Sequence, residues 1–245
     1  MPKIAESQAR RGAMYNPGKE RRMLSKSSRG QEPIWAGKRA CSVELAALPP
    51  MLLEIFERLE AAGARAACLF GGAARDADLE ALWGQPRPIK DYDLRCWIAP
   101  STMRQKTWEA DFGLALMRAF EGSSMEMAKS AGTGRLRHVL RWRCLELDVS
   151  ARPRPEGQAT SSDCARERAL DADASLSAVA VDSDLRGWCE ALYAADRAAR
   201  RLSYYPGVDP ARLAAYRERL RAKFPDIPER HMASPAPDAS AGGAR

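Results

Sequence analysis

A short stretch near residue 70 constrains the fold of this chain more than any other. The apolar run at residues 66–70 leads directly into Gly71 and Gly72, and a helix-like segment containing Arg75 and Asp76 follows. Glycine adopts backbone angles that other residues avoid, so this order predicts a strand that turns tightly into a helix. The first backbone N–H groups of such a helix have no partner within it and favour an anion. The stretch therefore predicts an anion-binding strand–turn–helix unit.

A second strand-like segment, residues 89–98, carries two aspartates, Asp91 and Asp93. Residues i and i+2 of a strand lie on one face, so both carboxylates point the same way while Tyr92 and Leu94 face the core. Aligned carboxylates repel each other unless a cation lies between them, and hard cations such as Mg²⁺ prefer carboxylate and phosphate oxygens. A phosphate-binding turn beside a carboxylate pair indicates metal-assisted phosphoryl or nucleotidyl transfer.

Together the two segments resemble the head domain of the polymerase-β-like nucleotidyltransferases, most closely the bacterial poly(A) polymerase and CCA-adding branch. The resemblance is carried by Phe70-Gly71-Gly72-x-x-Arg75-Asp76 and Asp91-x-Asp93-Leu94. It implies an α/β (α+β) fold, with a short mixed sheet, helices mainly on one side and a short C-terminal helical extension. It also implies that Asp91 and Asp93 bind Mg²⁺, or Mn²⁺ in its place, and that Gly71 and Gly72 hold the triphosphate of an NTP, with ATP favoured.

Two parts of the expected site remain open at this level. Arg75 and Asp76 either contact phosphate directly or form a structural ion pair at the helix start. The resemblance further implies a third carboxylate on the strand at residues 145–150, whose side chains alternate between apolar and polar. Glu146 and Asp148 lie on the same face of that strand, and Asp148 is slightly preferred because its shorter side chain is held more rigidly.

A later segment, beginning at Asp173, is similar to a family motif that helps to seat the nucleotide. Asp173 matches the aspartate of that motif, and Ser177 stands where asparagine is usual. The resemblance implies that both help to seat the nucleotide. Ala172 stands where arginine is usual, although Arg166 and Arg168 lie close upstream. This departure indicates either a changed nucleotide preference or a weakened activity.

Composition divides the chain into four predicted segments. The first, residues 1–42, is an arm with ten Lys and Arg residues against three Glu and no apolar period, which predicts disorder. Residues 43–186 are the predicted head domain, and residues 187–227 are a short neck-like helical extension. Residues 228–245 are rich in Ala, Pro, Ser and Gly and are predicted to be a disordered tail.

The spacing of apolar residues, glycines and prolines predicts the remaining elements. Helices are expected at residues 51–62, 73–82, 102–120, 188–202 and 210–224. Strands are expected at residues 66–70, 89–98 and 145–150, and basic and apolar residues alternate over residues 135–143. Loops are expected at residues 122–134 and 152–165.

Charge and cysteine content bound the partners and the compartment. The net charge of +7 indicates a polyanionic partner. RNA, bound through the basic arm and helices, is the natural candidate, and an acidic membrane surface is the alternative. No apolar run approaches the roughly 20 residues that a bilayer-spanning helix needs, so no membrane insertion is expected. The six cysteines form no CxxC pair and no signal peptide is evident, which favours free thiols in the cytoplasm.

The predicted reaction is therefore Mg²⁺-dependent transfer of a nucleoside monophosphate from an NTP to a hydroxyl acceptor, with an RNA 3′ end favoured. Two alternatives remain. The RNA-binding domains of CCA-adding enzymes need more chain than follows residue 205, which would suit transfer to a protein or small molecule, as in toxin- or resistance-like enzymes. The departure at Ala172 and the lack of the family's base-selecting EDxxR motif would suit an inactive RNA-binding module.

Overall fold

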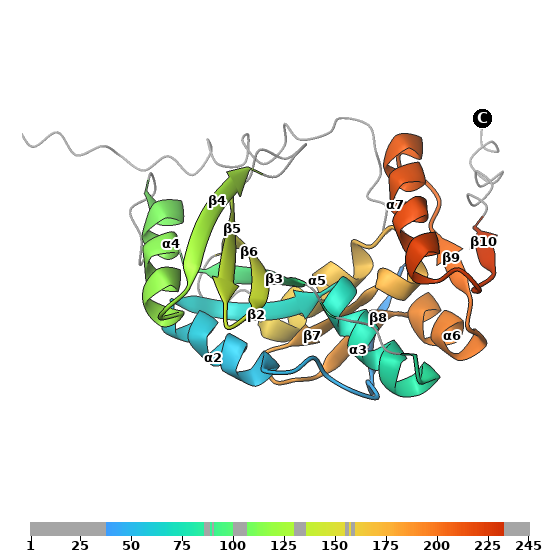
Figure 1. Ribbon diagram of the computed structural model, residues 1–245, viewed down its shortest axis with the longest axis horizontal. Helices are drawn as coiled ribbons and strands as arrows, with labels where there is room; N and C mark the ends of the chain where they lie inside the picture. The colour runs from blue at the N-terminus through green and yellow to red at the C-terminus, as the bar shows by residue number, and fades with distance from the viewer. Residues whose placement is uncertain are drawn as a thin grey trace, which may run out of the picture. The chain divides into compact units, whose positions relative to one another are not determined.

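A computed structural model of the chain describes residues 38–85, 89, 91–99, 107–129, 136–154, 157 and 160–232. Residues 1–37 of the predicted arm and residues 233–245 of the predicted tail lie outside these ranges. The described part contains an eight-stranded mixed sheet with helices packed on it and a small two-stranded sheet near the C-terminal end (Figure 1). None of its helices combines the length and the apolar composition that crossing a membrane requires. The predicted mixed α/β fold class is confirmed.

The elements alternate irregularly along the chain. The strands are β1 (Ala40–Val43), β2 (Ala64–Phe70), β3 (Asp91–Ile98), β4 (Ser124–Lys129), β5 (Leu136–Trp142), β6 (Leu145–Pro153), β7 (Val179–Asp182), β8 (Gly187–Glu190), β9 (Leu202–Tyr204) and β10 (Glu229–His231). The helices are α2 (Leu52–Ala61), α3 (Gly72–Trp83), α4 (Trp108–Ala119), α5 (Ser161–Leu170), α6 (Ala191–Ala199) and α7 (Pro210–Lys223), and a 3₁₀ turn, η2, covers Ser175–Ser177.

The large sheet has the strand order β1-β8-β7-β2-β3-β6-β5-β4. Only β3 and β6 run parallel to each other, and the remaining neighbours are antiparallel. The aspartate-bearing strand β3 is therefore central, with hydrogen bonds to β2 on one side and to β6 on the other. A strand held on both sides and buried on one face is a rigid support for the side chains on its other face.

One face of the sheet holds the main hydrophobic core. Helices α2 and α4 pack there, and Phe56 and Phe112 meet the strand residues Tyr92, Leu94 and Leu147. All five are at most 4% exposed. The alternation of β3 thus works as predicted, because its core-facing residues leave Asp91 and Asp93 on the opposite face.

Helix α5 covers part of that opposite face, and the prediction of a loop at residues 152–165 is wrong. Strand β6 continues to Pro153, and α5 starts after Thr160, which forms a capping box with Asp163. The helix buries only small residues, Cys164, Ala165 and Ala169, against the sheet. Such a face has little apolar surface, so the helical period was hidden by the polar residues around it.

Other local predictions were also wrong, among them disorder at residues 40–42 of the arm, which belong to β1. Residues 124–129, expected in a loop, form β4 at the edge of the sheet. The helix expected from residue 188 begins only at Ala191, because residues 187–190 form the fully buried strand β8. A Cβ on Gly187 would lie 2.4 Å from the Val43 carbonyl oxygen of β1, so this close strand pairing requires glycine.

The C-terminal part packs against the large sheet's helix α3 and adds its own strands. Strands β9 and β10 pair in parallel, so residues 229–231, assigned to the tail by composition, are a strand. Leu79 of α3, Leu202 of β9 and Leu220 of α7 share a hydrophobic cluster with Phe224. This packing brings α7 beside the start of α3, where the predicted site lies.

Candidate active site

The glycine turn, Gly71 and Gly72, joins β2 to α3 as the sequence predicts. Gly71 has φ 73° and ψ −128°, a backbone conformation that residues other than glycine rarely adopt. A Cβ at this position would lie 3.3 Å from Asp93 Oδ2. The turn therefore brings the backbone at the N-terminus of α3 close to a predicted metal ligand, and glycine is needed for both the turn and the approach.

The carboxylates gather on the open face of β3 and β6. In the parallel register Asp93 lies opposite Asp148, and Asp91 lies opposite Glu146. Asp148 is half-buried and its Oδ2 is 2.9 Å from Arg137 Nη1. Glu146 is exposed at the outer end of the face. Of the two candidates for the third acid, Asp148 is thus the one beside Asp93.

The negative charges of these groups act on one another. Burial, followed by the charges of Asp91 and Asp148, raises the pKa of Asp93 to about 6. Burial also raises the pKa of Asp148, although Arg137 opposes this effect. A buried carboxylate with like-charged neighbours is stabilised by a cation, and carboxylate oxygens are the donors that Mg²⁺ prefers. The chemistry of Asp91 and Asp93 thus fits the metal expected there.

The set of possible metal ligands in the described part of the chain is small. No group of three or more His, Cys, Asp or Glu side chains is arranged there to hold a metal ion. The predicted ligands, Asp91 and Asp93, form a smaller group than this, and their role stays a prediction.

A cavity of about 270 Å³ opens at the glycine turn. Seven residues predicted from the sequence line it: Gly71, Gly72, Arg75, Asp91, Asp93, Asp173 and Ser177. The other three, Asp76, Glu146 and Asp148, are not among its lining residues. Residues more than 100 positions apart in the chain, such as Gly71 and Ser177, are therefore brought together at one opening.

Arg75 and Asp76 form an ion pair at the start of α3. Arg75 Nε lies 2.7 Å from Asp76 Oδ1, and both side chains are about 95% buried. Lys223 Nζ lies 3.0 Å from the other oxygen, Asp76 Oδ2. Burial alone would raise the pKa of Asp76, but its two cationic partners outweigh burial and lower it. Arg75 Nη1 also donates to Ser177 Oγ at 3.2 Å. These contacts support the structural alternative for Arg75 and Asp76.

One wall of the cavity was not predicted from the sequence. Helix α7 contributes Arg212, Tyr216, Arg219 and Lys223, which repeat at helical spacing along one of its faces. Arg212 Nη2 lies 2.7 Å from Asp173 Oδ2, and the Tyr216 hydroxyl donates to Ser177 Oγ. The basic helix was predicted, and the period of these four residues was the available signal. Nothing in the sequence indicated which part of the chain this face would meet.

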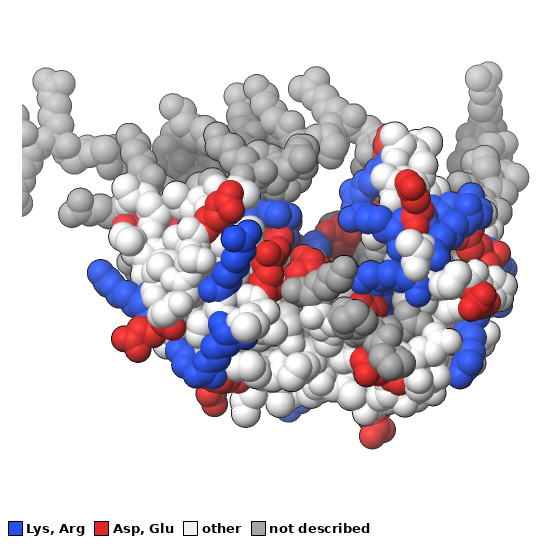
Figure 2. All heavy atoms as spheres, viewed as in Figure 1, with Lys and Arg blue, Asp and Glu red and all other residues white. Residues whose placement is uncertain are grey.

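Charges are distributed unevenly around the cavity. Figure 2 shows Lys and Arg side chains gathered over the part of the molecule where α7 lies, with acidic side chains in the hollow next to it. Arg168, from the last turn of α5, adds a further cation to the lining. The arrangement combines acids that suit a divalent cation with cations that suit a polyphosphate.

Comparison with known proteins gives structural neighbours only. No family model matches the sequence, and no curated protein matches it. The chain is similar to the CCA-adding enzyme of Thermotoga maritima in complex with tRNA, with 17% identity and a TM-score of 0.46, over 77% of this chain and 41% of that one. It is likewise similar to a CCA-adding enzyme in complex with CTP, with 19% identity and a TM-score of 0.46, over 76% and 41%. The chain thus spans about two-fifths of the length of these neighbours, which are CCA-adding enzymes.

Proposed function

We propose that this chain transfers a nucleoside monophosphate from an NTP to a hydroxyl acceptor and releases pyrophosphate. One observation carries the proposal: Asp91 and Asp93 open into the same cavity as the glycine turn. Nucleotidyl transfer needs acids for a divalent cation and an anion-binding site for the leaving phosphates within reach of each other. The central strand and the start of α3 supply both.

The nucleotide would be bound between the glycine turn and α7. The backbone N–H groups at the start of α3 would donate to the phosphates, and the positive end of the helix favours an anion there. Asp173 and Ser177, held by Arg212 and Tyr216, would seat the remainder of the nucleotide. ATP is the favoured substrate on the sequence resemblance.

Asp91 and Asp93 would hold Mg²⁺ or Mn²⁺. Bound there, the ion would offset the charge of the phosphates and make the attacking hydroxyl more acidic. Asp148 lies beside Asp93 and would accept the hydroxyl proton, a role favoured by its raised pKa. The ion pair with Arg137 keeps the Asp148 side chain in place.

The proposed acceptor is the 3′ end of an RNA. Support comes from the net charge of +7 and from the cations around the cavity. Lys and Arg side chains that bind a polyanion release its counterions, and this release strengthens binding. The hydroxyl of an RNA end would approach Asp91 and Asp93 from the open side of the cavity.

The test is incubation of the chain with each labelled NTP and Mg²⁺, together with either RNA or a cell extract that supplies protein and small-molecule hydroxyls. Label on RNA is expected with the wild type and is expected to disappear in Asp93→Asn. Asp184→Asn is the matched control, because Asp184 is exposed and lies away from the cavity. Label on protein or small molecules would contradict the RNA acceptor and keep the transfer reaction. No transfer from any NTP, in the wild type as in Asp93→Asn, would overturn the proposed activity and favour a binding module.

A further inference from the structure

The cavity contains an arginine next to the glycine turn that no motif assigned. One of the two roles expected for Arg75 was direct contact with phosphate, but Arg75 is buried and already bonded to Asp76 and Ser177. The position where the motif usually has arginine holds Ala172, which also lines the cavity. A triphosphate at the glycine turn would therefore need a cation from elsewhere in the chain.

Arg168 is placed to supply that cation. Its guanidinium carbon lies 3.9 Å from the centre of the Phe70 ring, and Phe70 directly precedes Gly71. Stacking on an aromatic face orients a guanidinium while leaving its N–H groups free to bond in the plane. The Arg168 side chain is 17% exposed, and its Nε is buried without a hydrogen-bond partner in the described part of the chain.

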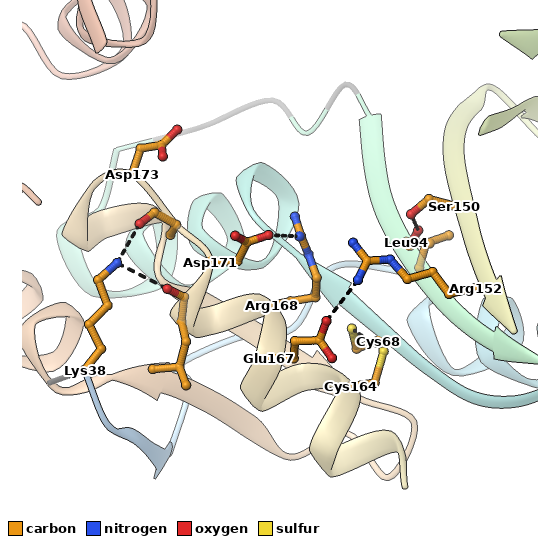
Figure 3. A network of polar contacts seen from close by, with 12 residues as sticks. Lys38, Cys68, Leu94, Ser150, Arg152, Cys164, Glu167, Arg168, Asp171 and Asp173 are labelled. Carbon is orange, nitrogen blue, oxygen red and sulfur yellow. Dashed lines mark hydrogen bonds and ion pairs between the residues drawn. The ribbon is translucent and has the colours of Figure 1, made fainter. Parts of the chain in front are cut away.

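The segment that carries Arg168 is firmly held. The small residues of α5 pack against the sheet, and Lys38 Nζ donates to the carbonyl oxygens of Leu170 at 3.2 Å and Ala172 at 2.9 Å (Figure 3). These carbonyls belong to the end of α5 and the residues after it, where a cation is favourable. Arg168 is thus presented to the cavity by a fixed helix end and a stacked ring.

Its present partner is exchangeable. Arg168 forms an ion pair with Asp171, just beyond the end of α5, as Figure 3 shows. The Asp171 side chain is 45% exposed, so water can replace the arginine as its partner. The structure gives one contact between the two side chains, from Arg168 Nη1 to Asp171 Oδ2, whereas phosphate oxygens offer a guanidinium a two-point contact and more charge.

We propose that Arg168 binds the terminal phosphates of the nucleoside triphosphate, exchanging Asp171 for phosphate oxygens. This inference rests on the proposed function, since it assumes that a triphosphate enters the cavity. Arg168 then holds the leaving phosphates from the α5 side, and the N-terminus of α3 holds them from the other.

Arg166 offers a matched control for the experiment. It belongs to the same helix, carries the same charge and also lies over an aromatic ring, Trp188, at 4.0 Å. It is exposed and does not line the cavity. Comparing Arg168→Ala with Arg166→Ala therefore separates a specific phosphate contact from a general loss of positive charge.

The measurement is the affinity for ATP and for AMP, each with Mg²⁺, by calorimetry. Loss of a charge-assisted contact predicts that Arg168→Ala weakens ATP binding about tenfold or more, whereas AMP, which lacks the terminal phosphates, changes less than about twofold. Arg166→Ala is expected to match the wild type for both nucleotides. Equal loss of ATP and AMP affinity in Arg168→Ala, or an equal loss of ATP affinity in Arg166→Ala, would overturn the inference.

A second variant guards against misfolding. Arg168→Gln keeps the length and polarity of the side chain without its charge, and it should show the same selective loss of ATP affinity. A wild type that binds no ATP would also overturn the inference. Selective loss of ATP binding in both variants, in a chain that transfers no label, would sustain the phosphate contact and refute the transferase activity.

Discussion

The cavity has two walls that are built very differently. The strand wall consists of Asp91 and Asp93. They lie on a central strand whose alternate residues, Tyr92 and Leu94, are completely buried on the other face. The helix wall is the face of α7 that carries Arg212, Tyr216, Arg219 and Lys223, and the buried residue of that helix is Leu220. Side chains on the strand wall are positioned by the core. Three of those on the helix wall are held by polar contacts: Lys223 with Asp76, Arg212 with Asp173 and Tyr216 with Ser177.

This difference indicates which side chains of the site are held in fixed positions and which can move. Groups that hold a metal and act on reacting atoms need a fixed position, which a packed sheet provides. Groups that bind the substrate's charge tolerate movement, and three of those on α7 bond to carboxylates or a hydroxyl that a ligand could replace. Changes in the strand wall should therefore act on the chemical step, and changes in the helix wall on nucleotide affinity.

The sharpest contrast is expected from Asp93→Asn. Loss of a charged group at the reacting centre should lower kcat by on the order of a thousandfold, with little change in KM for the NTP. Arg219→Ala, on the helix wall, should instead raise KM and leave kcat within about twofold. Steady-state kinetics of labelled transfer would show both effects. A larger loss of kcat in Arg219→Ala than in Asp93→Asn would refute the assignment of roles to the two walls.

Gly71→Ala should damage the strand wall without touching a charge. The new Cβ would meet Asp93 Oδ2 at 3.3 Å, and the backbone conformation of Gly71 disfavours any other residue, at a cost of about 1–3 kcal/mol. We expect about a hundredfold lower kcat/KM, since small displacements of reacting groups are costly. Gly84→Ala is the control, because that glycine also has a positive φ, of 66°, but a Cβ there meets nothing. It should unfold more easily than the wild type yet retain activity.

The two walls also differ in how far the sequence could predict them. The strand wall follows from local rules: the period of two in β3 separates Asp93 from Leu94, and paired glycines mark the turn. The helix wall depends on a contact between residues about 150 positions apart, Asp76 and Lys223, and no local pattern encodes such a contact. Helix α5 was missed for a related reason, since the small side chains that it buries leave no strong apolar period.

The burial of Asp93 beside other carboxylates predicts an unusual dependence of folding stability on pH. In metal-free protein the pKa of Asp93 is raised to about 6, against about 4 in the unfolded chain. A carboxyl whose folded pKa is raised stabilises the fold below the unfolded pKa, and this contribution is lost as pH rises through the folded pKa. Asp93→Asn should therefore match the wild type near pH 4 and exceed its unfolding free energy above pH 6 by up to about 3 kcal/mol.

Chemical denaturation in EDTA across this pH range measures the difference. Added Mg²⁺ should stabilise the wild type at pH 7.5 and leave Asp93→Asn unchanged. The difference in unfolding free energy between the two proteins should then become smaller. A difference in unfolding free energy between the two proteins that stays constant from pH 4 to pH 8 would show that the pKa of Asp93 is not raised in the folded protein.

The smallest effect is expected from Lys223→Ala, which weakens the attachment of the helix wall to α3. Lys223 is half-exposed, and exposed ion pairs contribute up to about 1 kcal/mol, so KM for the NTP should rise no more than about fivefold with kcat nearly unchanged. Arg221→Ala is the control, because Arg221 lies on the same helix but pairs with Glu229 at 2.7 Å, away from the cavity. If Lys223→Ala lowered kcat about a hundredfold, the helix wall would have to position reacting groups as well, and the separation between chemistry and affinity would fail.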